Sequence, residues 1–198
     1  MYRVIHPTEA DALIDEEEFE RDERLPYWAD LWPSAVALAR YVAEENLEGR
    51  RVVELGCGVG LPSVVALARG AKVTAADHYA VALESARYNA RVNLGDREPE
   101  TRLLDWHASD TEGLEPFDLV LAADVLYESR NVPALAALIP TLLAPGGEVL
   151  IADPRRKDTP VFLESMRERG FDSSAEERLV YSEGREVRVA IHRLRRVS

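Results

Sequence analysis

The chain has 198 residues, of which 46% are apolar, and a formal net charge of −12 at pH 7. This length suits a single α/β domain, and the acidic charge disfavours nucleic-acid partners, whose phosphate backbones attract Lys and Arg. No apolar run approaches the roughly 20 residues needed to span a bilayer, so we expect a soluble protein.

The start of the chain and its cysteine content indicate a compartment. The first thirty residues are rich in Asp and Glu and lack the basic and then apolar pattern of a secretory signal. The sole cysteine, Cys57, cannot form an intramolecular disulfide and fits a reducing environment. We therefore expect a cytoplasmic protein.

The N-terminal part is predicted to form an arm and a helix that pack on the core. Residues Thr8 to Asp30 include ten acidic side chains and few apolar anchors, which is typical of a lid or helical arm. Pro33 and Ser34 then introduce an amphipathic helix that should end near Asn46. We assign residues 1–48 to this N-terminal unit and residues 49–198 to the core, within one structural domain overall.

Strands and helices alternate along the core. The predicted strands are Val52 to Leu55, Lys72 to Ala76, Thr101 to Leu104, Phe117 to Ala122 and Glu148 to Ala152. The predicted helices are Pro62 to Arg69, Ala80 to Leu94, Pro133 to Leu143 and Pro160 to Arg169. Such alternation predicts right-handed crossovers and a mostly parallel sheet of the α/β class.

The last part of the chain breaks this alternation. Glu177 to Tyr181 and Glu186 to Leu194 are predicted to be two strands joined by a turn at residues 182–185. Five parallel strands followed by an antiparallel hairpin predict a seven-stranded, Rossmann-like sheet of the class I methyltransferase type rather than a dehydrogenase sheet.

A glycine-rich turn follows the first predicted strand of the core. The sequence Glu54-Leu55-Gly56-Cys57-Gly58-Val59-Gly60 leads from an apolar strand into a helix, and its glycines let the backbone approach a ligand closely. Leu61 stands where a dinucleotide turn has its third glycine. Because Glu54 also suits a ligand with a cationic amino-acid end, the turn favours S-adenosylmethionine over NAD. The alternative is a tight strand-to-helix turn without a ligand.

Polar residues after the next two strands complete the predicted cofactor site. Asp77 ends the second strand, where a carboxylate can accept hydrogen bonds from both ribose hydroxyls of a nucleoside. Asp105 and Trp106 follow the third strand, in a place that suits an acceptor for an adenine amino group and an aromatic surface beside it. The alternatives are a helix cap at Asp77 and a turn aspartate beside a packed tryptophan.

The fourth strand leads into Ala123-Asp124-Val125-Leu126-Tyr127-Glu128, which places a carboxylate and a phenol at the mouth of the site. The N-P-P-Y or D-P-P-Y sequence of many nucleic-acid amino-methylating enzymes is not found there, which further disfavours a base as the substrate. His78 and His107 follow strand ends and are candidate bases, although isolated loop histidines are more often surface residues. No group of His, Cys and Asp in the sequence has metal-ligand spacing.

Together these residues resemble the seven-β-strand protein lysine methyltransferases. The features that carry the resemblance are Leu25-Pro26-Tyr27-Trp28-Ala29, Leu31-Trp32-Pro33, Glu54 to Gly60, Asp124 with Tyr127, and Asp153-Pro154. They are most similar to the branch that modifies the β subunit of electron transfer flavoprotein, whose bacterial members have also been labelled nicotinamide N-methyltransferase-like. Arg155-Arg156 departs from the pattern in the substrate-side loop, where relatives often place a glycine.

The resemblance implies transfer of a methyl group from S-adenosylmethionine to an amine. Trp32 is then expected at the methionine end of the cofactor, and Asp124 and Tyr127 are expected to hold and orient the amine, with the base left open. The other expected cofactor residues are Glu54, Gly56, Cys57, Gly58, Gly60, Asp77, Asp105 and Trp106. We expect a protein substrate that presents a lysine. A small-molecule N-methyltransferase and a cofactor-binding module without turnover are the alternatives.

Overall fold

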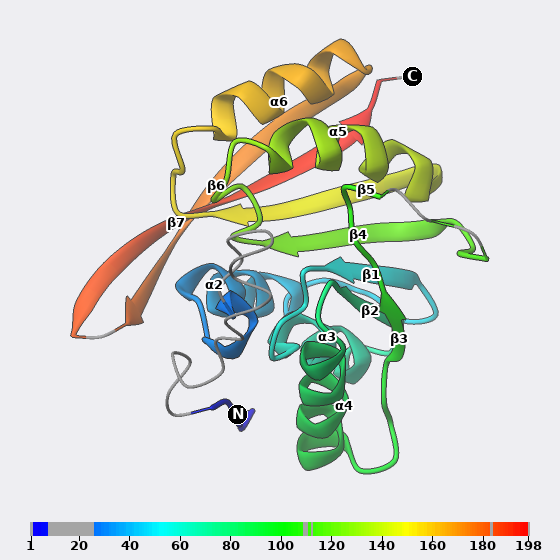
Figure 1. Ribbon diagram of the computed structural model, residues 1–198, viewed down its shortest axis with the longest axis vertical. Coiled ribbons are helices and arrows are strands. Elements are labelled where there is room, and N and C mark those ends of the chain that lie inside the picture. Colours follow the sequence, from blue (N-terminus) through cyan, green and yellow to red (C-terminus); the bar gives the residue numbers. More distant parts are fainter. Residues whose placement is uncertain (1, 8–25, 109–110, 112, 183, 198) are drawn as a thin grey trace.

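A seven-stranded sheet with helices on both faces forms the fold in the computed structural model (Figure 1), which describes residues 2–7, 26–108, 111, 113–182 and 184–197. The predicted arm at residues 8–25 lies outside the described residues, so its helical character stays a prediction. Among the residues described, no helix has the length and apolar composition needed to cross a membrane.

The strands follow the order β3-β2-β1-β4-β5-β7-β6 across the sheet. Strands β1 to β5 are parallel, and β7 pairs antiparallel with both β5 and β6. The predicted mostly parallel sheet with an antiparallel C-terminal hairpin is therefore confirmed. The strand bounds are β1 Arg51–Leu55, β2 Lys72–Asp77, β3 Glu100–Leu103, β4 Phe117–Ala123, β5 Leu143–Asp153, β6 Phe171–Ser182 and β7 Arg185–Arg196.

The helices bury both faces of the sheet because successive strand side chains point to opposite sides. On one face of the sheet, an apolar cluster joins Val52, Leu121 and Leu150 to helices α2 and α3. On the other face, a second cluster joins the adjacent strand residues, including Val53 and Val120, to α5 and α6. The helix bounds are η2 Tyr27–Ala29, α2 Pro33–Val42, α3 Leu61–Ala68, α4 Ala80–Leu94, α5 Asn131–Leu142 and α6 Thr159–Glu168.

Three predicted boundaries are wrong by several residues. Helix α2 ends at Val42 instead of near Asn46, because the amides of Glu44 and Glu45 turn back to carbonyls three residues earlier. Strand β5 begins at Leu143, five residues before its predicted start. Its pairing with β4 shifts in register there, because Phe117 pairs with Leu143 whereas Leu119 pairs with Glu148. Strand β6 begins at Phe171 rather than Glu177, and residues 172–177 are exposed, so they carry no apolar alternation.

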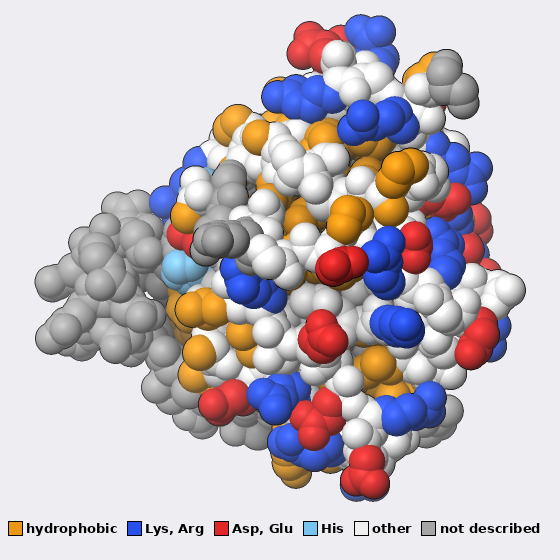
Figure 2. Space-filling view, turned by 90° about the vertical axis from the view of Figure 1, so that its right-hand side faces the viewer, with side chains coloured by type: hydrophobic (Ala, Val, Ile, Leu, Met, Phe, Trp, Pro, Cys, Tyr) orange, Lys and Arg blue, Asp and Glu red, His pale blue; other side chains and the backbone are white. Residues whose placement is uncertain are grey.

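The surface charge is mixed on the face opposite the carboxyl ends of the parallel strands. Figure 2 shows Lys and Arg side chains interspersed with Asp and Glu side chains over this face. Mixing of this kind keeps the local field small even though the net charge is −12.

Candidate active site

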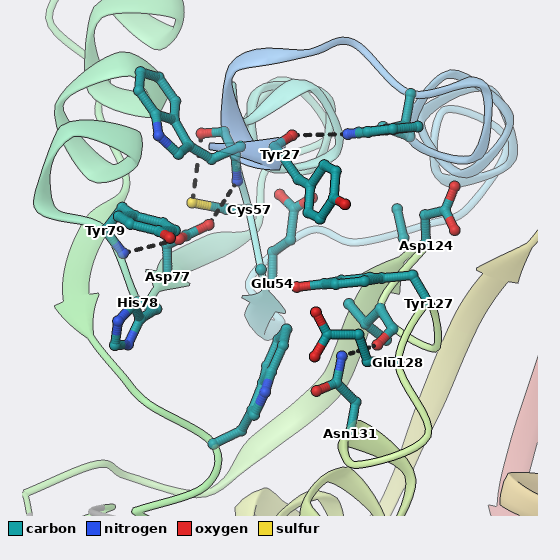
Figure 3. A pocket seen from close by; sticks show the side chains of 18 of the residues that line it. Tyr27, Glu54, Cys57, Asp77, His78, Tyr79, Asp124, Tyr127, Glu128 and Asn131 are labelled. Carbon is teal, nitrogen blue, oxygen red and sulfur yellow. Dashed lines mark hydrogen bonds between the residues drawn. The ribbon is translucent and has the colours of Figure 1, made fainter. Parts of the chain in front are cut away.

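A cavity of about 410 Å³ lies at the carboxyl ends of β1, β2 and β4 (Figure 3). Strand β1 lies between β2 and β4, so the cavity sits where the strand order reverses, the usual ligand site of open α/β sheets. Ten of the eleven predicted site residues line it: Trp32, Glu54, Gly56, Cys57, Gly58, Asp77, Asp105, Trp106, Asp124 and Tyr127. The part of the chain described here contains no group of His, Cys, Asp and Glu that could hold a metal ion.

Gly60, the remaining predicted site residue, lies behind the cavity. It has a left-handed φ of +77° at the start of α3, and a Cβ there would lie 2.6 Å from the Cβ of Ala86 on α4. A glycine is therefore required for packing between the two helices. Gly58 is different, because it lines the cavity and a Cβ on it would lie 3.0 Å from the backbone oxygen of Trp28.

Glu54 places a buried carboxyl group in the wall of the cavity. Its Oε2 accepts hydrogen bonds from the amide of Ser63 at 2.8 Å and from the Ser63 hydroxyl at 2.5 Å. Its Oε1 accepts none from any described residue, although it is buried. Burial raises the pKa of Glu54 to about 8. A buried oxygen without a donor fits a cationic or N–H-bearing ligand group, because leaving such an oxygen unpaired costs free energy.

Asp77 is fixed at the wall by two backbone hydrogen bonds. Its Oδ2 accepts from the amide of Gly58 at 2.9 Å, and its Oδ1 accepts from the amide of Tyr79 at 3.0 Å. Burial raises the pKa of Asp77. Tyr79, not Asp77, is the N-cap of α4, and it makes no side-chain cap bond. Each carboxylate oxygen keeps a further lone pair that can accept from a ligand hydroxyl.

Asp105 lies near both histidines that were considered as bases. Its Oδ2 is 3.6 Å from Nδ1 of His78, and its Oδ1 accepts from the amide of His107 at 2.9 Å. The His107 ring lies 3.2 Å from Oδ1 of Asn131. In Figure 3, His78 lies on the Asp77 side of the cavity, across from Asp124. His78 is therefore not placed as a base next to Asp124.

Asp124 follows β4 with its backbone in the left-handed region, at φ +57°. Its amide continues the ladder by donating to the carbonyl of Ala152 at 2.9 Å. Its buried carboxylate accepts a hydrogen bond from Nε of Arg156 at 2.8 Å on Oδ1, and the Ser34 hydroxyl donates to Oδ2 at 3.5 Å. The sequence marked Arg156 only as a departure from the family pattern, so its place in the site was missed.

Three aromatic rings that line the cavity with Asp124 lie close together. The Tyr27 ring meets Tyr127 edge-on at a centroid distance of 5.3 Å and Trp32 edge-on at 6.0 Å. The Trp32 indole is anchored because its Nε1 donates to the carbonyl oxygen of Tyr27 at 2.8 Å. Burial and the neighbouring charge of Glu128 raise the pKa of Tyr127 to about 12, so it remains a phenol at neutral pH. Tyr27 stood in a motif noted in the sequence but had no predicted role.

We name two parts of the cavity lining after the roles predicted for their residues. The cofactor end comprises Glu54, Gly56, Cys57, Gly58, Asp77, Asp105 and Trp106, and the acceptor end comprises Tyr27, Asp124, Tyr127 and Arg156. Trp32, predicted at the methionine end of the cofactor, lies beside Tyr27. Burial raises the pKa of the Cys57 thiol, which keeps it from acting as a nucleophile. Figure 3 shows Glu54 between Asp77 and Asp124.

The fold matches that of solved methyltransferase structures. The chain superposes on the magnesium protoporphyrin IX methyltransferase of Synechocystis with bound S-adenosylmethionine, with a TM-score of 0.66, 18% identity and coverage of 93% of this chain and 86% of that one. For the N-methyltransferase NodS of Bradyrhizobium japonicum with S-adenosylhomocysteine, the TM-score is 0.67, the identity 16% and the coverage 94% and 95%. The chain has the class I S-adenosylmethionine-dependent methyltransferase fold.

Sequence comparison identifies the family within this class. The profile of a family described as lysine methyltransferase matches residues 17–169, so the chain belongs to the lysine methyltransferase family. It is 34% identical over 137 residues to the electron transfer flavoprotein beta subunit lysine methyltransferase of Xenopus laevis, covering 66% of this chain and 53% of the relative. The resemblance predicted from the sequence is confirmed at this level.

Other relatives carry other substrate names. EEF1A lysine methyltransferase 3 of Mus musculus is 32% identical over 139 residues, covering 68% of this chain and 59% of the relative. The histone-arginine methyltransferase METTL23 of Xenopus laevis is 36% identical over 110 residues, covering 53% and 47%. The chain thus spans about half the length of these curated relatives.

Proposed function

We propose that this protein transfers a methyl group from S-adenosylmethionine to the side-chain amine of a lysine on a partner protein. One observation carries the proposal. The same cavity is lined by Glu54, whose buried Oε1 accepts no hydrogen bond from a described residue, and by Asp124 and Tyr127. Family membership supports the lysine acceptor, since two of the relatives described above are named as protein lysine methyltransferases.

The cofactor end has a polar group for each part of the cofactor. Oε1 of Glu54 would accept from the amino group of the methionine end, and Asp77 would accept from the ribose hydroxyls. Asp105 and Trp106, which line the same cavity, would provide an acceptor for the adenine amino group and an apolar surface beside the ring. When bound there, S-adenosylmethionine supplies a methyl group activated by the positive sulfur.

The acceptor end orients the amine. In-line displacement requires the nitrogen lone pair about 3 to 3.5 Å from the methyl carbon, so alignment is the main contribution of the protein. Oδ2 of Asp124 has lone pairs left to accept an N–H of the amine, and the Tyr27 and Tyr127 rings form walls beside it. Tyr127 is too weak an acid to supply a phenolate base at neutral pH, so its role is to orient the amine rather than to take its proton.

The acceptor end opens at the surface. Tyr27 and Tyr127, which flank it, are 39% and 37% exposed. A side chain that projects from another protein can therefore enter the cavity beside these rings, and Asp124 lines the same cavity. A small amine could enter by the same route, which makes the acceptor class a question for experiment.

Tritiated methyl transfer tests the proposal directly. The purified protein is incubated with labelled S-adenosylmethionine and fractionated lysate, and label is expected in protein, as methyl-lysine after hydrolysis. Asp124→Asn should lose most of this label while S-adenosylhomocysteine binding by calorimetry stays intact. Asp172→Asn, at an exposed position on β6, is the matched control and should behave as wild type. Label confined to small molecules, or no binding of S-adenosylhomocysteine, contradicts the proposal.

A further inference from the structure

Arg156 occupies a place in the acceptor end that the proposed chemistry has not used. Its Nε donates to Oδ1 of Asp124 at 2.8 Å, with the Asp124 side chain 6% exposed and that of Arg156 36% exposed. Its backbone amide donates to Oδ1 of the buried Asp153 at 2.8 Å, which fixes the loop that carries it. The hydrogen bond to Asp124 raises the pKa of Arg156, so the guanidinium stays charged.

The other charged and titratable groups near this ion pair come from several elements. Asp153 ends β5, Tyr27 belongs to η2, and Tyr127 and Glu128 follow β4. Glu128 is paired with Arg130, and Asp30 also lines the cavity. Asp124 lines the cavity as the carboxylate proposed to hold the amine, and Arg156 already compensates its charge.

A carboxylate that is paired with a cation affects the protonation of a bound amine differently from an unpaired carboxylate. A bare carboxylate stabilises an ammonium ion and raises its pKa, whereas a nearby cation lowers it. Methyl transfer needs the neutral amine, because the ammonium ion has no lone pair. A lysine amine can give up its proton, but a guanidinium does not lose its charge in a protein.

We propose that Arg156 is a specificity-determining residue: paired with Asp124, it makes the acceptor end take a primary amine in its neutral form and reject a guanidinium. The inference rests on the lysine methylation proposed above and goes beyond it by naming the residue that selects the charge state of the acceptor. Asp124 then accepts an N–H from the amine through Oδ2 while Oδ1 stays with Arg156.

Two small probes separate the charge states. n-Butylamine resembles the lysine side chain and can lose its proton, whereas n-butylguanidine keeps its charge. Binding of each compound to the protein loaded with S-adenosylhomocysteine is followed by NMR from pH 7 to 9.5. Wild type should bind butylamine about tenfold more tightly for each pH unit, because the neutral fraction of an amine with a pKa near 10.4 rises tenfold. It should bind butylguanidine at least tenfold more weakly than Arg156→Gln does.

The variants give the opposite pattern and a control. Arg156→Gln should bind butylamine with nearly constant affinity over this pH range, since the bare carboxylate takes the ammonium ion. Arg155→Gln is the matched control, because Arg155 pairs with Glu177 and does not line the cavity. It should behave as wild type. Equal pH slopes for wild type and Arg156→Gln, or equal butylguanidine affinity, overturn the inference.

A kinetic measurement distinguishes this role from the proposed function itself. With the protein acceptor that becomes labelled, Arg156→Gln should have kcat at least tenfold lower than wild type at pH 7.5, rising steeply with pH up to 9.5, and a lower KM. Arg156→Lys should keep the wild-type pH profile. An unchanged profile in Arg156→Gln, alongside normal labelling by wild type, rejects only the role of Arg156. Failure of wild type to bind S-adenosylhomocysteine or to label protein rejects the function on which it rests.

Discussion

Cofactor binding should release a proton from Glu54. Burial raises the pKa of this carboxyl to about 8, so at pH 7 roughly ten of every eleven molecules carry the proton. A cationic amino group at Oε1 favours the ionised form and expels the proton. If the pKa of a group falls when a ligand binds, the affinity for that ligand rises with pH until the pH passes the pKa of the group in the free protein. Affinity at pH 7 should thus be about tenfold, or about 1.4 kcal/mol, weaker than its value once Glu54 is ionised.

Calorimetry with S-adenosylhomocysteine measures this proton. Titrations at pH 7 in buffers with different ionisation enthalpies should give about 0.9 proton released by wild type. Glu54→Gln should release close to none, because glutamine does not titrate, and its affinity should be flat between pH 6 and 8. Glu115→Gln, whose side chain is 84% exposed, is the control and should match wild type.

Two results would refute the reasoning. One is a wild-type affinity that does not change between pH 6 and 8, with no proton released. The other is equal proton release by wild type and Glu54→Gln, which would assign the proton to a different group, such as the neighbouring Asp77.

Four further predictions concern stability, the cofactor and the acceptor. Gly60→Ala should lower the free energy of unfolding by about 2–4 kcal/mol through left-handed strain and the clash with α4. Gly49→Ala, which has open space around it, should lose only about 1–2 kcal/mol in the same thermal unfolding assay. Asp77→Asn should weaken S-adenosylhomocysteine binding about tenfold or more by calorimetry, and an unchanged Kd would reject its ribose role. Tyr127→Phe should reduce methyl transfer with cofactor affinity within twofold of wild type, whereas parallel losses would move Tyr127 to the cofactor end. Transfer to a lysine-bearing protein should fall as salt rises from 0.05 to 0.5 M, because screening weakens attraction to an acidic enzyme, and a salt-independent rate would favour a small neutral acceptor.

The sequence predicted those elements whose residues are buried in a regular pattern. Helix α4 was predicted with its observed bounds, and β1 to β4 were predicted within one residue at each end. For β1, β2 and β4 the reason is that apolar runs bounded by turns mark buried strands. The first part of strand β6 was not predicted, because residues 172–177 are exposed and show no apolar alternation. Hydrogen bonds to β7 hold this part in the sheet, which is a tertiary effect.

The site was predictable to the extent that parallel strands end at one edge of the sheet. Residues directly after β1, β2, β3 and β4 therefore converge on the cavity. Arg156 was not predictable, since its direction depends on Arg155 adopting a φ of +68°, which a non-glycine residue rarely does. Gly60 was assigned to the ligand because its real neighbour, Ala86, lies on another helix.

The strand order β5-β7-β6 also sets an order of events during synthesis. Strand β6 leaves the ribosome before β7, yet among the described strands it pairs with β7 alone. Until residues 185–196 emerge, the outer edge of β5 stays open and β6 has no neighbour, which exposes unpaired backbone to other chains. The nascent chain can complete strands β1 to β5 with their helices first, and β7 then inserts between two waiting strands. A ribosome that stalls within β7 would release a chain whose cavity residues are all present but whose sheet has an open edge.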